Sequence, residues 1–425
     1  MSEEITTDKP AIKFHGWRVT FVGMGINLAL GVLYSWSIIS GGMENAGWGW
    51  TQAEKGRPYA LACLVFCLIM VPAGRMQDKL GPRLVATIGG ILVGIGMIFA
   101  GIMGESQIGW LIGFGVLAGA GIGFGYASAT PPAVKWFPAA KTGLIAGLVV
   151  SGFGLASVYI APLASWIISN YGLEKTAMVL GIGFLVIVVS LAQFLKAPPA
   201  GYVPAGQPPK ENNSGKKEDF LPREMLRTWQ FYLLWFMYAC GAGAGLMVIS
   251  IAKKIGKASG VGVAAVTALA IGNGAGRIIA GVLSDKIGRK ATMFIFFVLQ
   301  AIVVVLLAGA VRGQMSAGTL IIILSAMVGA NYGSNLSLFP SATKDFYGLK
   351  NFGMNYGLIF TAWGIGGYML SQFAAKVYDG KIIEAWKGSF NFAFYCSAGL
   401  LIVAAIIVFF VKPPHHTIET QTKSK

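Results

Sequence analysis

The chain has 425 residues, of which 55% are hydrophobic and only 12% are charged, and its formal net charge is +16. Soluble globular proteins carry roughly 25% charged residues, so this composition excludes an ordinary soluble protein. The basic excess alone would suit nucleic-acid binding, but lysine and arginine concentrate in the loops on one side of the expected spans, as the positive-inside rule describes. The excess therefore indicates membrane topology and contact with an anionic lipid bilayer, with no nucleic-acid partner.

Apolar runs of about 20 residues, long enough to cross ~30 Å of hydrocarbon as helices, recur along the whole chain. We predict twelve spans, at residues 17–39, 58–77, 84–104, 109–130, 143–165, 175–196, 229–251, 261–284, 291–310, 318–340, 354–376 and 389–411. A polar, proline-containing stretch at 197–228 predicts a cytoplasmic linker. The expected fold is an all-α membrane protein with two six-helix halves, 1–196 and 229–425, as in repeat-built transporters.

The first thirteen residues are polar and charged, so no signal peptide is expected there. The cysteines fall inside predicted spans, where packing is the expected role, and they are Cys63, Cys67, Cys240 and Cys396. The three histidines lie near the chain ends, so we expect neither a metal site nor a cofactor. No span carries a nucleophile–base pair or a phosphate-binding loop, and the sequence does not indicate an enzyme.

A pattern of the form Gly-x-x-x-Asp-Lys-x-Gly occurs twice, at 74–81 after the second span and at 281–288 after the eighth. Two copies at equivalent places in the two halves indicate an internal repeat, and the pattern resembles the cytoplasmic loop signature of the major facilitator superfamily. An aspartate here can pair with cations or cap a neighbouring helix in one conformation, which predicts gating and not substrate binding. The predicted gating residues are Asp78, Arg83, Asp285 and Arg289.

Arg277 is the only basic residue deep within a predicted span. It precedes Ser284 by seven residues, or about 10 Å along a helix. A central arginine costs at least ~2.5 kcal/mol to insert, so it normally faces a cavity or a partner. No acidic residue lies deep in a span, and we therefore predict that the guanidinium pairs with a carboxylate of the substrate. The alternative is an arginine bonded to backbone carbonyls.

Helical spacing places Asn273 one turn before Arg277 and on the same face. With aromatic and amide residues from other spans, this predicts a chamber around one cation, which suits a small anion with an apolar body. The predicted substrate-binding residues are Arg277, Asn273, Tyr34, Tyr126, Tyr332, Asn335, Phe360 and Trp363.

Five stretches across both halves resemble the oxalate/formate antiporter family and its monocarboxylate-porter relatives. They are residues 31–36, 135–138, 273–289, 338–341 and 355–357. The resemblance implies that the substrate arginine is Arg277 and that the aromatic residues of the site are Tyr34, Tyr126 and Tyr332.

Two departures from the family pattern bear on the substrate. Oxalate carriers have a second cation, a lysine, where this chain has Trp363. A dicarboxylate would then leave one buried carboxylate unpaired at a cost of several kcal/mol, which favours a monocarboxylate such as lactate, pyruvate or formate. Animal monocarboxylate porters carry an aspartate where this chain has Asn273, so a proton carried at that position is not expected.

The leading hypothesis is secondary transport of a small monocarboxylate by alternating access, coupled to protons as the resemblance implies. The alternative is exchange against a counter-anion, which needs no titratable site. A membrane acid sensor is a third possibility, but it would need a soluble output domain for which the linker and tails leave no room. We expect a multi-pass monomer in the inner membrane with both termini in the cytoplasm.

Overall fold

The computed structural model describes residues 14–199, 202–204, 219–311 and 318–414, and these residues form helices and no strands. The first thirteen residues, two of the three histidines and half of the predicted linker lie outside the described residues. The helices are α1 (Gly16–Leu30), α2 (Trp36–Asn45), α3 (Gln52–Leu80), α4 (Pro82–Ile102), α5 (Gln107–Trp110), α6 (Gly119–Lys135), α7 (Thr142–Tyr171), α8 (Leu173–Ala192), α9 (Pro222–Met225), α10 (Trp229–Ala258), α11 (Val263–Ile287), α12 (Arg289–Val311), α13 (Gly318–Tyr347), α14 (Phe352–Tyr378) and α15 (Asn391–Phe410).

Within the described residues, eleven helical segments are long and apolar enough to cross a membrane. They correspond to eleven of the twelve predicted spans. The remaining one, predicted at 354–376, is α14, which has 27 residues but is less apolar than the others. The physical reason is that α14 buries polar side chains such as Asn355 and Tyr356 inside the protein. Polar groups that face other helices lower the mean hydropathy of a span, although these groups are not exposed to lipid.

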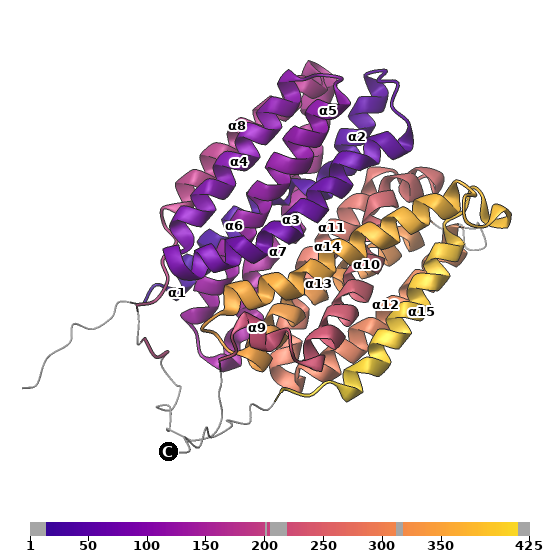
Figure 1. Cartoon of the computed structure of the whole chain (residues 1–425). Coiled ribbons are helices and arrows are strands. Elements are labelled where there is room, and N and C mark those ends of the chain that lie inside the picture. The colour runs from indigo at the N-terminus through magenta and orange to yellow at the C-terminus, as the bar shows by residue number, and fades with distance from the viewer. Residues whose placement is uncertain (1–13, 200–201, 205–218, 312–317, 415–425) are drawn as a thin grey trace, which may run out of the picture.

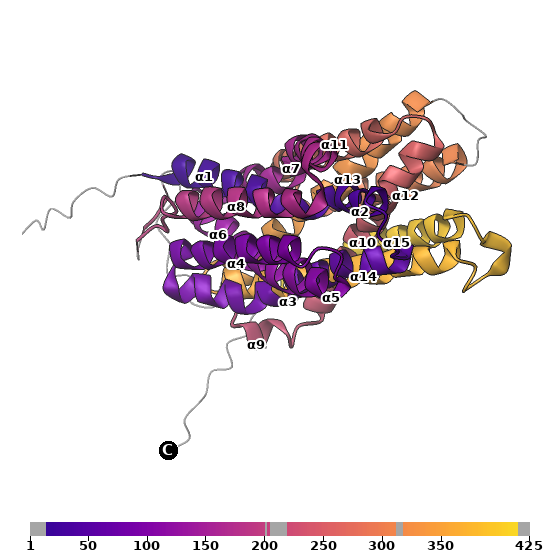
Figure 2. The same ribbon diagram turned by 90° about the horizontal axis from the view of Figure 1, so that it is seen from above.

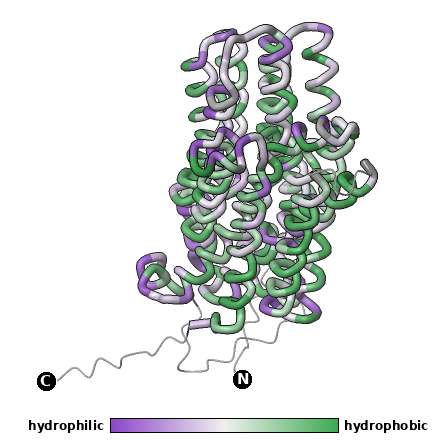
Figure 3. Tube along the Cα trace, turned by 90° about the vertical axis from the view of Figure 1, so that its right-hand side faces the viewer, coloured by the Kyte–Doolittle hydropathy of each residue, from purple (hydrophilic) through white to green (hydrophobic). Residues whose placement is uncertain are grey.

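The helices gather into two bundles, which we call the N-terminal bundle (α1–α8) and the C-terminal bundle (α10–α15) (Figure 1). The start of α1, the short helix α9 and the end of α15 lie at one end of the molecule, which we call the linker face. The opposite end is the distal face. Hydrophilic segments are concentrated in the loops at these two ends, as a membrane-spanning bundle requires (Figure 3). The boundaries predicted at 196 and 229 stay a prediction.

The two bundles meet along α7 with α11 and along α3 with α14 (Figure 2). Glycines allow the backbones of these pairs to touch. A Cβ added at Gly147 would lie 2.5 Å from the carbonyl oxygen of Arg277, and one at Gly357 would lie 2.6 Å from that of Met70. Small residues at helix contacts are typical of membrane proteins, where close packing provides the attraction. The contact extends from the linker face toward the middle of the molecule and places Arg277 at the seam.

The first span is interrupted by a 3₁₀ segment, Gly31–Ser35, between α1 and α2. The helix α7 crosses closely here, because a Cβ at Gly31 would lie 2.6 Å from the carbonyl oxygen of Phe153. Short 3₁₀ stretches within helices often mark functional hinges. Tyr34 belongs to this segment, so one predicted site residue sits on a local irregularity of the backbone.

Candidate substrate-binding site

Arg277 lies in α11 at the seam between the bundles, and its side chain is fully buried. Nε donates a hydrogen bond to Oδ1 of Asn273 (3.0 Å), and Nη2 donates one to the hydroxyl of Tyr34 (3.1 Å). Nη1 donates to the backbone carbonyl of Val150. The guanidinium therefore contacts the predicted partner Asn273. It also contacts a backbone carbonyl, as the alternative interpretation expects.

No carboxylate among the described residues forms an ion pair with Arg277. A guanidinium has five N–H donors, and the three bonds above leave two of them for another acceptor. A buried cation without a counter-charge is costly, so such groups are normally paired. The arrangement is therefore suited to a carboxylate that comes from outside the chain.

A chain of hydroxyl and indole groups continues from Arg277 across the seam. The hydroxyl of Tyr34 is hydrogen-bonded to that of Tyr332, and Nε1 of Trp363 donates to the Tyr332 hydroxyl (2.8 Å). Tyr34 belongs to the first span, Tyr332 to α13 and Trp363 to α14. The predicted residues Asn273, Tyr34, Tyr332 and Trp363 are thus joined to Arg277 by one polar network that includes both bundles.

Aromatic rings form the apolar side of the site. Phe360 stacks on Trp363 with 5.1 Å between ring centroids, and it lies 5.4 Å from Tyr126. Tyr126 in turn meets Phe153 edge-on at 5.4 Å. The buried hydroxyl of Tyr126 has no hydrogen-bond partner in the described part of the chain. These predicted residues therefore lie together, with one polar group available beside the rings.

Asn335 is the predicted site residue that the structure does not bring to Arg277. Its amide nitrogen donates to the carbonyls of Asn331 (3.0 Å) and Tyr332 (3.2 Å). Its Oδ1 faces α10, where a Cβ added at Gly241 would lie 2.5 Å away. Asn331 and Asn335 are four residues apart and share a face of α13, but that face points into the C-terminal bundle.

Sequence reasoning missed Phe66 and Phe153. Phe66 lies 5.0 Å from Phe360 and 5.1 Å from Trp363, and the ring of Phe153 lies 5.9 Å from Cζ of Arg277. A signal existed for Phe153, because glycines flank it on both sides. A Cβ at one of them, Gly154, would lie 3.1 Å from Nε of Arg277. Such glycines permit the close approach of α7 to α11.

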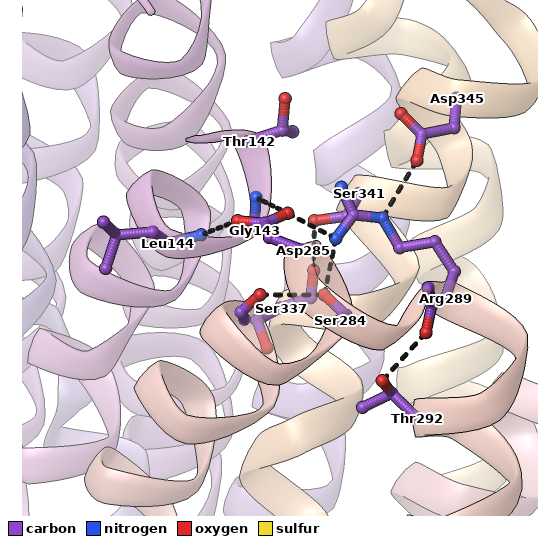
Figure 4. A network of polar contacts seen from close by, with 12 residues as sticks. Thr142, Gly143, Leu144, Ser284, Asp285, Arg289, Thr292, Ser337, Ser341 and Asp345 are labelled. Atoms are coloured by element: carbon purple, nitrogen blue, oxygen red, sulfur yellow. Dashed lines mark hydrogen bonds and ion pairs between the residues drawn. The ribbon is translucent and has the colours of Figure 1, made fainter. Parts of the chain in front are cut away.

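At the linker face, Asp285 joins the two bundles (Figure 4). Its carboxylate accepts the backbone N–H groups of Gly143 (3.1 Å) and Leu144 (2.9 Å) at the first turn of α7. Arg289 pairs with the same carboxylate (2.6 Å) and with Asp345 of α13 (2.9 Å). A carboxylate at a helix N-terminus satisfies free N–H groups and the helix dipole.

The first copy of the repeated motif makes the equivalent contact in the other direction. Asp78, at the end of α3, pairs with Lys135 (3.2 Å) and accepts the N–H of Met354 (3.3 Å) in the first turn of α14. Each motif aspartate thus caps a helix of the opposite bundle. Arg83 differs from Arg289, because its side chain is exposed and contacts no carboxylate of the described residues. Arg83 is not part of this contact between bundles.

On the distal side of Tyr34, the structure has a cavity of about 120 Å³ between the bundles. Its lining residues come from the first span, from the start of α3 and from α10, and they are Leu33, Tyr34, Trp36, Ser37, Ser40, Lys55, Gly56, Tyr59, Ile249 and Ser250. A smaller cavity beside it is lined by Tyr34 and Asn273, the residues that contact Arg277. The larger cavity therefore reaches Tyr34 from the distal side, whereas the bundles are in contact at the linker face.

Comparison with known proteins agrees with this architecture. The sequence model of the Major Facilitator Superfamily matches residues 19–367 and 244–425. The chain belongs to the major facilitator superfamily. The predicted fold class is confirmed, and the protein is a multi-pass membrane transporter, not an enzyme by family or by fold.

Among its relatives, the "Uncharacterized MFS-type transporter YhjX" of Escherichia coli is 32% identical over 82% of this chain and 85% of that protein. The "Oxalate:formate antiporter" of Oxalobacter formigenes is 28% identical over 90% of this chain and 88% of the antiporter. The E. coli fucose:proton symporter FucP has a similar structure, with a TM-score of 0.67, 15% identity and coverage of 93% of this chain and 98% of FucP. The resemblance to oxalate/formate antiporters that the sequence predicted is thus confirmed, because the chain is related to one of them.

Proposed function

We propose that the protein is a secondary transporter of small monocarboxylates, such as lactate, pyruvate or formate, that works by alternating access around Arg277. The observation that carries the proposal is the fully buried guanidinium with no carboxylate partner in the described residues. Its two remaining donors fit the two oxygens of a carboxylate. Similarity to the oxalate:formate antiporter supports the same class of substrate.

The preference for one carboxylate over two follows from the surroundings of Arg277. Trp363, which stands where oxalate carriers have a lysine, donates its N–H to Tyr332 and stacks on Phe360. An indole supplies no positive charge, and a second carboxylate there would be buried without a cation at a cost of several kcal/mol. The aromatic rings instead provide an apolar surface for the methyl group of lactate or pyruvate.

Proton coupling is the mode that we propose first, and exchange against a counter-anion is the alternative. A specific observation favours exchange, because the residue one turn before Arg277 is Asn273, whose Oδ1 accepts from Nε and cannot carry a proton. In an exchanger, an anion is bound to the guanidinium in both directions of the transport cycle, so no proton is needed to neutralise the site. A proton symporter would need the substrate carboxylate, or an acid at the rim of the site, to carry the proton.

Alternating access would follow from the positions of the contacts. We propose that the Asp78 and Asp285 contacts hold the linker face closed while the distal cavity gives access to the site, and that they separate when the bundles rock. In this proposal the linker face is cytoplasmic, the membrane is a bacterial inner membrane, and the protein acts as a monomer. An excess of basic residues on the linker side supports that orientation.

The test is uptake of labelled L-lactate into liposomes that contain the purified protein. An inward proton gradient is imposed on empty liposomes and on liposomes preloaded with unlabelled lactate. Accumulation driven by the gradient in empty liposomes would establish proton symport. Uptake only into preloaded liposomes would establish exchange. No uptake of lactate, pyruvate or formate in either condition would refute the proposed substrate class.

A further inference from the structure

Lys55 is a second buried cation that lines the distal cavity. It lies in the first turn of α3, and its side chain is 7% exposed. Its ammonium pairs with Oε2 of Glu44 at 3.1 Å, while the Glu44 side chain is 64% exposed. The cavity that Lys55 lines also reaches Tyr34, which contacts Arg277. A cation, a cavity and a route to the candidate site therefore adjoin one another.

The surroundings of Lys55 favour an anion. Lys55 lies near the N-terminus of α3, which is the positive end of the helix dipole, and Thr51 and Glu54 form a capping box there. Tyr59, one turn farther along α3, lines the same cavity and is 8% exposed, and its hydroxyl is buried. A Cβ added at Gly56, which lines the same cavity, would meet nothing within 4 Å, so there is open space at this position.

The ion pair with Glu44 is suited to exchange of its carboxylate. Glu44 is exposed to solvent, which screens its charge, so a carboxylate in the cavity can compete with it for the ammonium. A substrate carboxylate that replaces Glu44 keeps the buried ammonium paired. The volume of about 120 Å³ is enough for a small organic anion, since a single water needs only about 10–15 Å³ measured in this way.

We propose that Lys55 forms an outer carboxylate-binding site, where the substrate displaces Glu44 before it passes Tyr34 to reach Arg277. The inference rests on the proposed transport of small monocarboxylates and adds the residue that captures them from the distal side. Glu44 acts as an internal competitor at this site. It keeps the ammonium paired when no substrate is bound and weakens the apparent affinity for the substrate.

Two substitutions that should change KM in opposite directions test this role. KM and kcat for labelled L-lactate are measured in liposomes for the wild type, Lys55→Gln, Glu44→Gln and Lys55→Arg. Loss of the cation should raise KM about tenfold with little change in kcat, as expected for loss of a charge-assisted hydrogen bond made by the bound substrate. Removal of the competing carboxylate should lower KM by about threefold. Lys55→Arg keeps the charge and should stay near the wild type.

Arg57→Gln is the matched control, because Arg57 is an exposed cation two residues away that does not line the cavity. A purely structural ion pair would make Lys55→Gln and Glu44→Gln fail in the same direction, and that result, or an unchanged KM in both, would overturn the outer site. Those outcomes leave the proposed function intact as long as the wild type transports lactate. A wild type that takes up none of the three monocarboxylates removes both proposals, and this is seen before any variant is made.

Discussion

Replacement of Arg277 by glutamine is the perturbation that the structure makes most informative. The substitution removes the buried charge but leaves a side chain that can still donate to Asn273 or Tyr34, which Arg277 contacts at 3.0 and 3.1 Å. The site would then lack the cation for the carboxylate. Leaving one member of a buried ion pair alone costs about 3–5 kcal/mol. At 1.4 kcal/mol per factor of ten, kcat/KM for L-lactate should fall by roughly 100- to 4,000-fold.

The assay is initial uptake of labelled L-lactate into liposomes at matched protein content. Size-exclusion chromatography and thermal unfolding in detergent show whether the variant is folded, which we expect because no carboxylate of the described residues loses a partner. Arg223→Gln is the control, since Arg223 is an exposed arginine on the linker face. If folded Arg277→Gln protein takes up lactate at the rate of the wild type, Arg277 has a structural role and the reasoning is refuted.

Two further predictions concern selectivity and gating. Trp363→Lys should improve the competition of oxalate with labelled lactate about tenfold relative to Trp363→Met, because the lysine supplies the second cation. Trp363→Met is the control that removes the ring without adding a charge. Equal competition in the two variants would contradict our interpretation of Trp363. Asp285→Asn should weaken the contacts to Gly143, Leu144 and Arg289 and shift the ratio of linker-face-closed to open protein by roughly 5- to 30-fold, for a loss of about 1–2 kcal/mol. Spin-label distances between the linker-face ends of α7 and α11 measure this ratio, with Asp379→Asn, an exposed aspartate at the distal face, as the control; an unchanged distance distribution would show that Asp285 does not hold the bundles together.

Much of the fold could be predicted because membrane spans impose a simple length and polarity rule. Arg277 also stood out, since a charge within an apolar span has no local explanation. The repeated motif predicted that Asp78 and Asp285 can cap neighbouring helices. In the structure, each of these aspartates caps a helix of the opposite bundle.

The rotation of each helix about its axis was harder to predict. Asn335 and Asn331 share a face as their spacing requires, but which neighbour that face meets depends on how α13 packs against α10 and α11. Phe153 is an apolar residue in an apolar span, and its flanking glycines indicate a close helix contact without showing that this contact lies at the site. The hydrogen bond between Tyr34 and Tyr332 joins residues of different bundles and follows only from the tertiary structure.

Lys55 shows a related limit. A lysine near the end of a span is normally explained by snorkelling to the interface, so its sequence position carries no sign of a site. Only the structure shows that the Lys55 side chain is buried and lines a cavity between the bundles.

The most direct test of the central claim, that one buried arginine selects one carboxylate, is equilibrium binding of L-lactate and oxalate to the purified protein by calorimetry. Besides the outer site proposed at Lys55, we predict one lactate site per chain that is lost in Arg277→Gln, and an affinity of that site for lactate at least about tenfold above that for oxalate, which would bury an unpaired charge. Tighter binding of oxalate, or lactate binding that survives in Arg277→Gln with unchanged affinity, would contradict the account.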